Sequence, residues 1–275
     1  MNVIEALKVI LLGIVEGITE WLPISSTGHM LLLDEWITLS ASEAFKEMFF
    51  VVIQLGAILA VVVIFWQKMV PFQLRDKAKP FVLKARISLW LKVALACIPG
   101  AAVTLLFDDY IEAKLHTPMV IACTLIFYGI LFIVIENWNK NRRPRITTLE
   151  DITYQTALMI GLFQVLSIIP GTSRSGATII GGLILGVSRV AAAEFTFFLA
   201  VPVMFGLSFL KIFKFGLSFT GTELSMLLIG SAVAFFVSLF VIHFLMGYIK
   251  RHDFKVFGWY RIVLGTALLL YFTLS

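Results

Sequence analysis

The sequence predicts an all-α polytopic membrane protein, and three observations carry this prediction. Hydrophobic residues make up 60% of the 275 positions and charged residues only 14%, which is more apolar surface than a soluble domain needs. Apolar runs follow one another with short connections, and most could cross a bilayer as a helix of roughly 20 residues. No hydrophilic stretch is long enough for a second domain. We therefore expect a single integral membrane domain over residues 1–275 with about six full spans.

The apolar runs cover residues 3–22, 24–38, 47–66, 87–107, 117–136, 153–170, 174–187, 192–213, 224–246 and 257–273. The runs 24–38 and 174–187 are short, because a helix of either length covers only about 21 Å of the roughly 30 Å hydrocarbon core. Each follows a proline and several polar residues. Irregular backbone at membrane depth is tolerated only inside protein or beside a wet cavity. The pairs 3–38 and 153–187 are therefore expected to be re-entrant or broken helix pairs.

Three connecting segments, residues 67–86, 138–152 and 247–256, are strongly basic. The positive-inside rule places them in the cytoplasm. The predicted loop 108–116 carries Asp108, Asp109 and Glu112 and falls outside. Once these loops are assigned to the two sides of the membrane, the helix pair 3–38 starts and ends outside, and the pair 153–187 starts and ends inside. Both termini then lie outside. The net charge of +5 is spread over loops between apolar runs, which argues against nucleic acid as a partner.

The two halves of the chain match each other at a few polar and small residues, and the charge count orients them oppositely. Together these features predict an inverted repeat, with halves of about 1–137 and 153–275 joined by the basic linker 138–152. The polar clusters would then meet near a pseudo-two-fold axis inside the membrane. At an offset of 148 the matches pair Gly13, Glu16, Ser25, Thr27 and Gly28 with Gly161, Gln164, Ser173, Ser175 and Gly176, and at an offset of 140 they pair Gln54, Ala60, Val61 and Val63 with Glu194, Ala200, Val201 and Val203.

One polar cluster lies in the stretch Gln164 to Thr178, inside an apolar segment where ionisable groups indicate a functional site by default. Backbone N–H groups at the start of a helix bind anions, and the guanidinium of Arg174 matches phosphate oxygens. We expect a phosphate site with Arg174 at its centre. The alternative is an N-cap beside an arginine that extends to the interface. The remaining residues expected to bind substrate here are Gly171, Thr172, Ser173, Ser175, Gly176 and Thr178.

The other polar cluster runs from Glu16 to His29. Glu16 and Glu20 share one helix face, where two carboxylates repel unless a cation or a shared proton joins them. Ser25, Ser26 and Thr27 precede His29, so a candidate nucleophile and a candidate base lie within one turn. Ser25 and Thr27 are expected to bind substrate. The alternative interpretation is that the hydroxyls cap the following helix and that the carboxylates pair with buried polar groups.

Other polar residues in the apolar runs receive weaker predictions. Gln54, Gln164 and Glu194 are expected to contact side chains of the two clusters and hold them in place. Arg261 follows Trp259 and Tyr260 near the cytoplasmic end of the last span, which favours an interfacial anchor. Cys97 and Cys123 are expected to be small buried hydrophobes rather than a disulfide.

The two polar clusters carry a family resemblance. Glu16-x-x-x-Glu20 with Leu22-Pro23-Ile24-Ser25-Ser26-Thr27-Gly28-His29, and Pro170-Gly171-Thr172-Ser173-Arg174-Ser175-Gly176-Ala177-Thr178, resemble the two signature motifs of the undecaprenyl-diphosphate phosphatases. These are the bacitracin-resistance family of bacterial inner-membrane enzymes. The resemblance runs over nearly the whole chain and includes residues 54–62, 194–195 and 200–202.

The resemblance implies hydrolysis of a C55 isoprenyl diphosphate to the monophosphate carrier lipid of cell-wall synthesis. It implies that Ser26 is the nucleophile, that Arg174 binds the diphosphate, and that the active site opens outward. It also implies dependence on a divalent cation, which we expect to be Mg²⁺ or Ca²⁺ held by Glu16 and Glu20. His29 is expected to handle the proton. The expected partners are the polyprenyl diphosphate lipid and the bilayer.

A second functional class stays open at this point. Inverted repeats, broken helices and charges at mid-membrane are also typical of transporters, so a lipid-carrier flippase is the alternative. The sequence leaves undecided the lipid chain length, the metal, the choice between serine and histidine as nucleophile, and the oligomeric state, a homodimer included.

Overall fold

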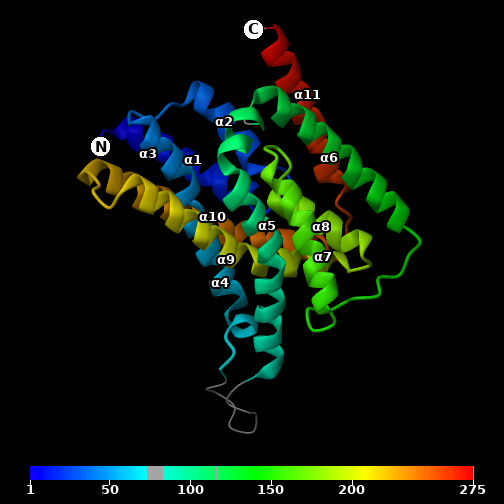
Figure 1. Cartoon of the computed structure of the whole chain (residues 1–275). Helices are drawn as coiled ribbons and strands as arrows, with labels where there is room; N and C mark the ends of the chain where they lie inside the picture. The colour runs from blue at the N-terminus through cyan, green and yellow to red at the C-terminus, as the bar shows by residue number, and fades with distance from the viewer. Residues whose placement is uncertain (73–82, 116, 275) are drawn as a thin grey trace.

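The computed structural model describes residues 1–72, 83–115 and 117–274, and its described part is a bundle of helices (Figure 1). The helices of the first half are α1 (Val3–Thr19), α2 (Ser26–Trp36), α3 (Glu43–Val52), α4 (Gln54–Met69), α5 (Lys84–Leu115) and α6 (Pro118–Asn139). Those of the second half are α7 (Tyr154–Val165), the short 3-10 helix η1 (Leu166–Ile168), α8 (Arg174–Ile184), α9 (Arg189–Phe215), α10 (Gly221–Tyr248) and α11 (Lys255–Leu274).

Six candidate spans are present among the described residues, and α3 and α4 form one of them with a break at Ile53. The pairs α1–α2 and α7–α8 are built of helices of only 17, 11, 12 and 11 residues. An 11-residue helix covers about 17 Å, too little to cross the hydrocarbon core. The prediction of about six spans with two short helix pairs is confirmed.

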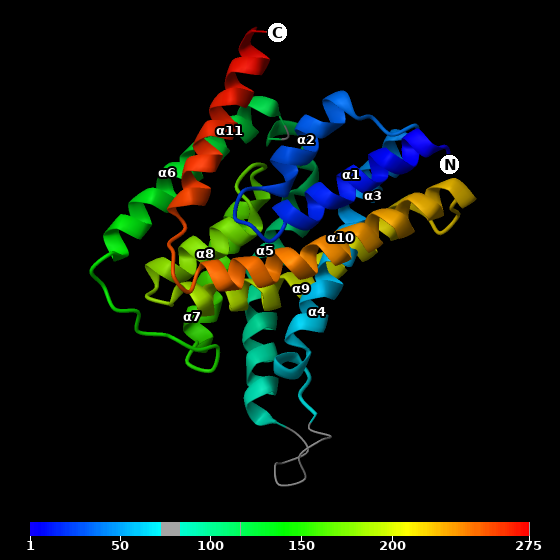
Figure 2. The same ribbon diagram turned by 180° about the vertical axis from the view of Figure 1, so that it is seen from behind.

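The packing of the helices follows the two-fold relationship between the halves. Helix α1 packs against α10, and its counterpart α7 packs against α5. Likewise α4 packs against α10, and α9 packs against α5. Helix α6 packs against its own counterpart α11, side by side in both views (Figures 1 and 2). These helix contacts therefore occur in equivalent pairs in the two halves, as expected for an inverted repeat.

Glycines allow the close approach of α6 and α11. A Cβ added at Gly129 would lie 2.7 Å from the carbonyl oxygen of Gly258, and one added at Gly258 would lie 2.7 Å from that of Gly129. Small residues at helix contacts let backbones pack closely where no hydrophobic effect drives association in lipid. This contact fixes α11, and with it Tyr260 and Arg261, beside the rest of the bundle.

Three sequence expectations need comment. The predicted loop at 108–116 is wrong, because α5 continues to Leu115. No glycine or proline interrupts residues 108–115, and Pro118 comes only after them. Cys123 is exposed rather than buried. A thiol is tolerated on the outer face of a membrane helix because it contacts apolar lipid there. Of the basic segment 67–86, residues 73–82 lie outside the described residues, as do the side chains of 108–113.

The two termini lie toward the same end of the molecule in both views, while the end of α4 and the start of α5 lie at the opposite end (Figures 1 and 2). Helix α2 lies toward the end that carries the termini. Lys68 lies in the last turn of α4, and Lys84 is the first residue of α5. Both lysines therefore lie at the end opposite the termini, the end that the loops assign to the cytoplasm.

Candidate active site

The turns before α2 and α8 have the same construction. Ser25 caps α2 by accepting a hydrogen bond from the Gly28 N–H at 3.4 Å, and Ser173 caps α8 by accepting one from the Gly176 N–H at 3.2 Å. Among the described non-glycine residues these two serines alone have positive φ, 74° and 71°. Such strained residues gather at functional sites. The matching turns lead directly to Ser26 and Arg174, which begin the two helices.

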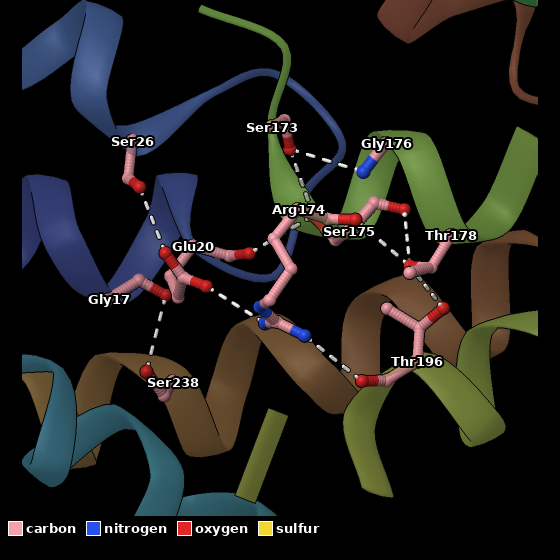
Figure 3. A network of polar contacts seen from close by, with 10 residues as sticks. All are labelled: Gly17, Glu20, Ser26, Ser173, Arg174, Ser175, Gly176, Thr178, Thr196 and Ser238. Atoms are coloured by element: carbon pink, nitrogen blue, oxygen red, sulfur yellow. Dashed lines mark hydrogen bonds and ion pairs between the residues drawn. The ribbon is translucent and has the colours of Figure 1, made fainter. Parts of the chain in front are cut away.

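Glu20 joins the two polar clusters. Its Oε2 atom accepts a hydrogen bond from the Ser26 hydroxyl at 2.9 Å, and its Oε1 atom accepts one from Nη2 of Arg174, also at 2.9 Å. The side chains of Glu20 and Arg174 are only 7% and 11% exposed. Figure 3 shows the carboxylate between the serine of one half and the arginine of the other. A hydroxyl, a carboxylate and a guanidinium from distant parts of the chain therefore form one connected unit.

Arg174 is held from a second side by α9. Its Nη1 atom donates to the carbonyl oxygen of Thr196 at 3.1 Å, and the Thr196 hydroxyl lies 2.8 Å from that of Thr178 (Figure 3). The Thr178 hydroxyl also donates to the carbonyl of Arg174 at 2.9 Å. These contacts fix the direction of the guanidinium. Thr196 was not predicted from the sequence, because a threonine within an apolar run carries no signal of its own.

Several buried polar atoms of the two clusters have no hydrogen-bond partner among the described residues. They include Oε1 of Glu16, Oε1 of Gln164 and Nε of Arg174. Glu16 and Gln164 are the pair related by the repeat, and both are buried. An unpaired buried polar group costs free energy and needs an explanation. A bound polar ligand or ion would supply these atoms with partners.

His29 is oriented away from the role expected for it. Its Nδ1 lies 2.7 Å from the carbonyl oxygen of Ser25, and its Nε2 lies 2.7 Å from the hydroxyl of Tyr260. Because a carbonyl only accepts, Nδ1 carries the proton in the neutral ring and Nε2 accepts from Tyr260. The structure does not bring His29 into hydrogen-bond contact with Ser26, whose partner is Glu20.

Several other residues of the second cluster hold the α8 turn together. The Ser175 hydroxyl lies 3.1 Å from that of Ser173 and donates to the backbone carbonyl of Glu20 at 3.3 Å. Thr172 is buried, and Gly171 has a φ of +87°, a conformation that suits glycine. In the first cluster, Thr27 is exposed.

Glu194, one of the residues predicted to support the clusters, has its charged partner elsewhere. Glu194 forms an ion pair with Lys68 at 2.7 Å, which ties α9 to the end of α4 rather than to Arg174. This partner, Lys68, lies in the last turn of α4, and the repeat match could not reveal it. Gln54 is half-buried at the first residue of α4.

The comparisons with known proteins identify the family. The family model described as bacitracin resistance protein BacA matches residues 9–267.

The chain belongs to the bacitracin resistance protein family.

The family's curated members include close relatives of this chain. An undecaprenyl-diphosphatase of Enterococcus faecalis is 71% identical over 270 residues, which cover 98% of this chain and 98% of the relative. An undecaprenyl-diphosphatase of Desulfitobacterium hafniense is 62% identical over 274 residues, with coverage of 99% and 98%. One of Lachnoclostridium phytofermentans is 60% identical and covers both chains completely. The family assignment therefore extends to both polar clusters and to all the helices between them.

The prediction that Arg261 anchors the protein at the interface is wrong. Arg261 is 0% exposed and lies between the two active-site turns. Its Nη1 donates to the carbonyl of Pro23 at 3.1 Å, and its Nη2 donates to the carbonyls of Gly171 and Thr172 at 2.7 and 2.9 Å. The five donors of a guanidinium can satisfy several carbonyls at once. The sequence signal for this role was the position of Arg261 inside an apolar run, because charged residues there pair with backbone carbonyls in the interior of the bundle.

The chain offers limited ligands for a divalent cation. No group of three or more His, Cys, Asp or Glu side chains suited to a metal occurs among the described residues. Glu16 and Glu20 provide two carboxylates on one helix face, and one oxygen of Glu16 is unpaired. Mg²⁺ usually binds through one or two carboxylates together with waters and substrate phosphates. The residues fit a cation site of this shared kind.

Proposed function

We propose that this chain is a membrane phosphatase that hydrolyses undecaprenyl diphosphate to undecaprenyl phosphate and inorganic phosphate. The observation that carries the proposal is the carboxylate of Glu20, which accepts hydrogen bonds from both Ser26 and Arg174 at 2.9 Å. Glu20, as the base, thus contacts both the nucleophile Ser26 and the phosphate-binding cation Arg174. The names of the relatives, undecaprenyl-diphosphatases over nearly the full chain, support the substrate and the reaction. The activity recycles the cell-wall carrier lipid and confers bacitracin resistance.

In the first step, the oxygen of Ser26 attacks the terminal phosphorus of the diphosphate. The Oγ–P bond forms, the bond from phosphorus to the bridging oxygen breaks, and undecaprenyl phosphate leaves with that oxygen. The hydroxyl proton passes to Glu20, which already accepts it in a hydrogen bond. An adjacent base activates a serine in this way. This proposal gives Glu20 the proton-transfer role that the sequence suggested for His29.

In the second step, water hydrolyses the phosphoserine. Glu20 has passed its proton to the leaving phosphate and is again a carboxylate, so it can take a proton from the attacking water. The water oxygen bonds to phosphorus, the P–Oγ bond breaks, and Ser26 recovers a proton. Inorganic phosphate is released. One carboxylate thereby serves both steps.

Arg174 and the start of α8 bind the diphosphate. The unpaired Nε of Arg174 is available to a phosphate oxygen, and the guanidinium fork suits bidentate binding of phosphate. The backbone N–H groups of the first turn of α8 add donors at a helix N-terminus. A divalent cation on Glu16 and Glu20 would neutralise charge on the diphosphate. His29 and Tyr260 close the side of the site that α11 covers.

The enzyme is proposed to lie in the bacterial inner membrane with its site open to the extracytoplasmic side. Two features support this orientation. The basic linker and loops indicate the cytoplasmic end, and α2, which begins with Ser26, lies toward the end that carries both termini (Figure 1). Thr27 next to Ser26 is exposed, which is consistent with access from that end.

One experiment separates hydrolysis from transport. The purified protein in detergent, without vesicles, is given undecaprenyl diphosphate, and released phosphate is measured. We expect turnover that depends on Ser26, because a flippase needs two membrane faces and no nucleophile. Absence of phosphate release from folded protein, with lipid movement in reconstituted vesicles, would favour the transporter.

A further inference from the structure

A cavity of about 710 Å³ lies at the basic end of the molecule, and its lining shares no residue with the active site. It is enclosed by the linker after α6, the turn between α8 and α9, and the end of α10. Its charged lining consists of Arg142, Arg143, Arg145, Arg189, Lys250 and a single carboxylate, Glu136. The phosphatase mechanism does not use these cations, and membrane orientation alone does not require them to line a cavity.

The one carboxylate does not neutralise this lining. Glu136 is buried and accepts two hydrogen bonds from Nε of Arg189, at 2.9 and 3.1 Å, and another from the backbone N–H of Phe254 at 2.9 Å. Its charge is therefore satisfied by Arg189. The other four cations have no carboxylate partner within the part of the chain that the structure describes. The guanidinium of Arg142 instead lies 3.6 Å from the ring centre of Trp138.

The walls of the cavity are fixed by hydrogen bonds along the linker. The side-chain amide of Asn139 donates to the carbonyl of Leu183 at 3.2 Å. Further along, the Arg145 N–H donates to the carbonyl of Gly186, and the Ser188 N–H donates to that of Ile146, both at 2.8 Å. The first half of the linker is thus tied to the end of α8 and to the α8–α9 turn. The arginines are held over the cavity by an ordered backbone.

Part of the remaining lining is apolar, which points to an amphiphilic ligand. Leu183, Ile184, Leu185, Val190 and Ile249 contribute to it. Trp138 is 44% exposed, and tryptophan prefers the membrane–water interface. Basic pockets between membrane helices on the cytoplasmic side bind anionic lipid headgroups. We propose that this cavity binds the phosphate headgroup of an anionic phospholipid from the leaflet at the basic end of the protein.

The test uses the full-length protein in nanodiscs of neutral lipid, to which phosphatidylglycerol or cardiolipin is added in increasing amounts. Bound anionic lipid is counted by native mass spectrometry after release. The variant R143Q/R145Q removes two cations that carry no ion pair among the described residues, and the control K84Q/R251Q removes two cations from the other basic segments. We expect the first variant to weaken lipid retention about tenfold or more, and the control to change it less than about twofold. Neither variant touches Ser26, Glu20 or Arg174, so phosphate release in neutral lipid should stay unchanged.

Three results would overturn the proposal. Equal retention in wild type and R143Q/R145Q would show that the cavity does not hold the lipid, and equal loss in both double variants would show general charge attraction. Binding of inorganic phosphate or pyrophosphate that depends on Arg143 and Arg145, without lipid retention, would assign the cavity to a soluble anion. R143K/R145K keeps the charges and should retain lipid, which separates loss of binding from misfolding.

Discussion

Ser25 and Ser173 adopt the same unusual backbone conformation, with φ/ψ of 74°/98° and 71°/122°, at positions that the repeat makes equivalent. A non-glycine residue in this region costs roughly 1–3 kcal/mol unless its surroundings hold it there. The repeat therefore preserves two strained turns, each capped by its own serine. The next residues differ, Ser26 in one half and Arg174 in the other, and both reach Glu20. One turn thus leads to the proposed nucleophile, and its duplicate leads to the cation proposed to bind phosphate.

Replacing Ser26 by alanine should lower phosphate release by at least about a thousandfold. The protein should remain folded, because the lost hydroxyl leaves only a small space beside Glu20. Turnover is measured in detergent, and a phosphoserine is sought by mass spectrometry after rapid acid quenching of the wild type. Ser25→Ala is the neighbouring control; it loses an N-cap worth about 1 kcal/mol and should keep most of the activity. Equal turnover in S26A and wild type, or a trapped phosphohistidine at His29, would remove Ser26 as nucleophile.

Arg174→Lys should lower kcat/KM about a hundredfold. Lysine keeps the positive charge but cannot contact Glu20, the Thr196 carbonyl and a phosphate oxygen at the same time. The measurement is steady-state kinetics with undecaprenyl diphosphate, together with inhibition by inorganic pyrophosphate. Near-normal kinetics in the lysine variant would mean that Arg174 serves only as a fixed charge.

Removing either carboxylate should change the response to divalent cations. In Glu16→Gln and Glu20→Gln the concentration of Mg²⁺ or Ca²⁺ for half-maximal rate should rise, because one of two charged carboxylate ligands becomes a neutral carboxamide. Glu20→Gln should in addition lose most of its maximal rate, since a carboxamide cannot accept the serine proton. Chelation should suppress the wild type. Metal curves identical to the wild type, with only the rates scaled, would show that neither residue binds the ion.

Arg261→Lys should loosen both active-site turns. A lysine cannot reach the carbonyls of Pro23, Gly171 and Thr172 together, and each lost buried hydrogen bond costs about 1 kcal/mol or more. We expect lower thermal stability and a lower kcat, with KM changed less than in the Arg174 variant. His243→Gln is the control, because among the described residues His243 forms a single hydrogen bond, to the carbonyl of Leu239 in its own helix. Wild-type kcat in the Arg261 variant would contradict a positioning role.

Both termini should lie outside the cytoplasm, because three basic segments mark the interior side. Fusion of a reporter that works only in the periplasm to the C-terminus should be active, while the same reporter within the linker 140–146 should not. An inactive reporter at the C-terminus together with an active one in the linker would contradict this orientation.

The sequence by itself determined the class of fold and the two polar clusters. Lengths of apolar runs count spans directly, because a helix must cross a hydrocarbon core of fixed thickness. Polar residues such as Glu20 and Arg174 are conspicuous inside those runs, because burying an ionisable group in lipid is costly. The short runs predicted the broken helix pairs because they are too short to cross the hydrocarbon core. The end of α5 was misjudged because acidic residues were read as a loop, although none of them stops a helix.

Only the tertiary structure decided which polar groups meet. The approach of Glu20 to Arg174 depends on how α1, α8 and α9 pack, and no spacing along the chain encodes it. The same packing turns His29 toward Tyr260 instead of Ser26 and sends Glu194 to Lys68. Arg261 is the clearest case: its local sequence resembles an interfacial anchor, yet the contact of α11 with α6 places it inside the bundle. There it satisfies carbonyls of two turns about 90 and 240 residues away in the chain, because hydrogen bonding inside a membrane protein is settled by which backbone groups the fold leaves unpaired.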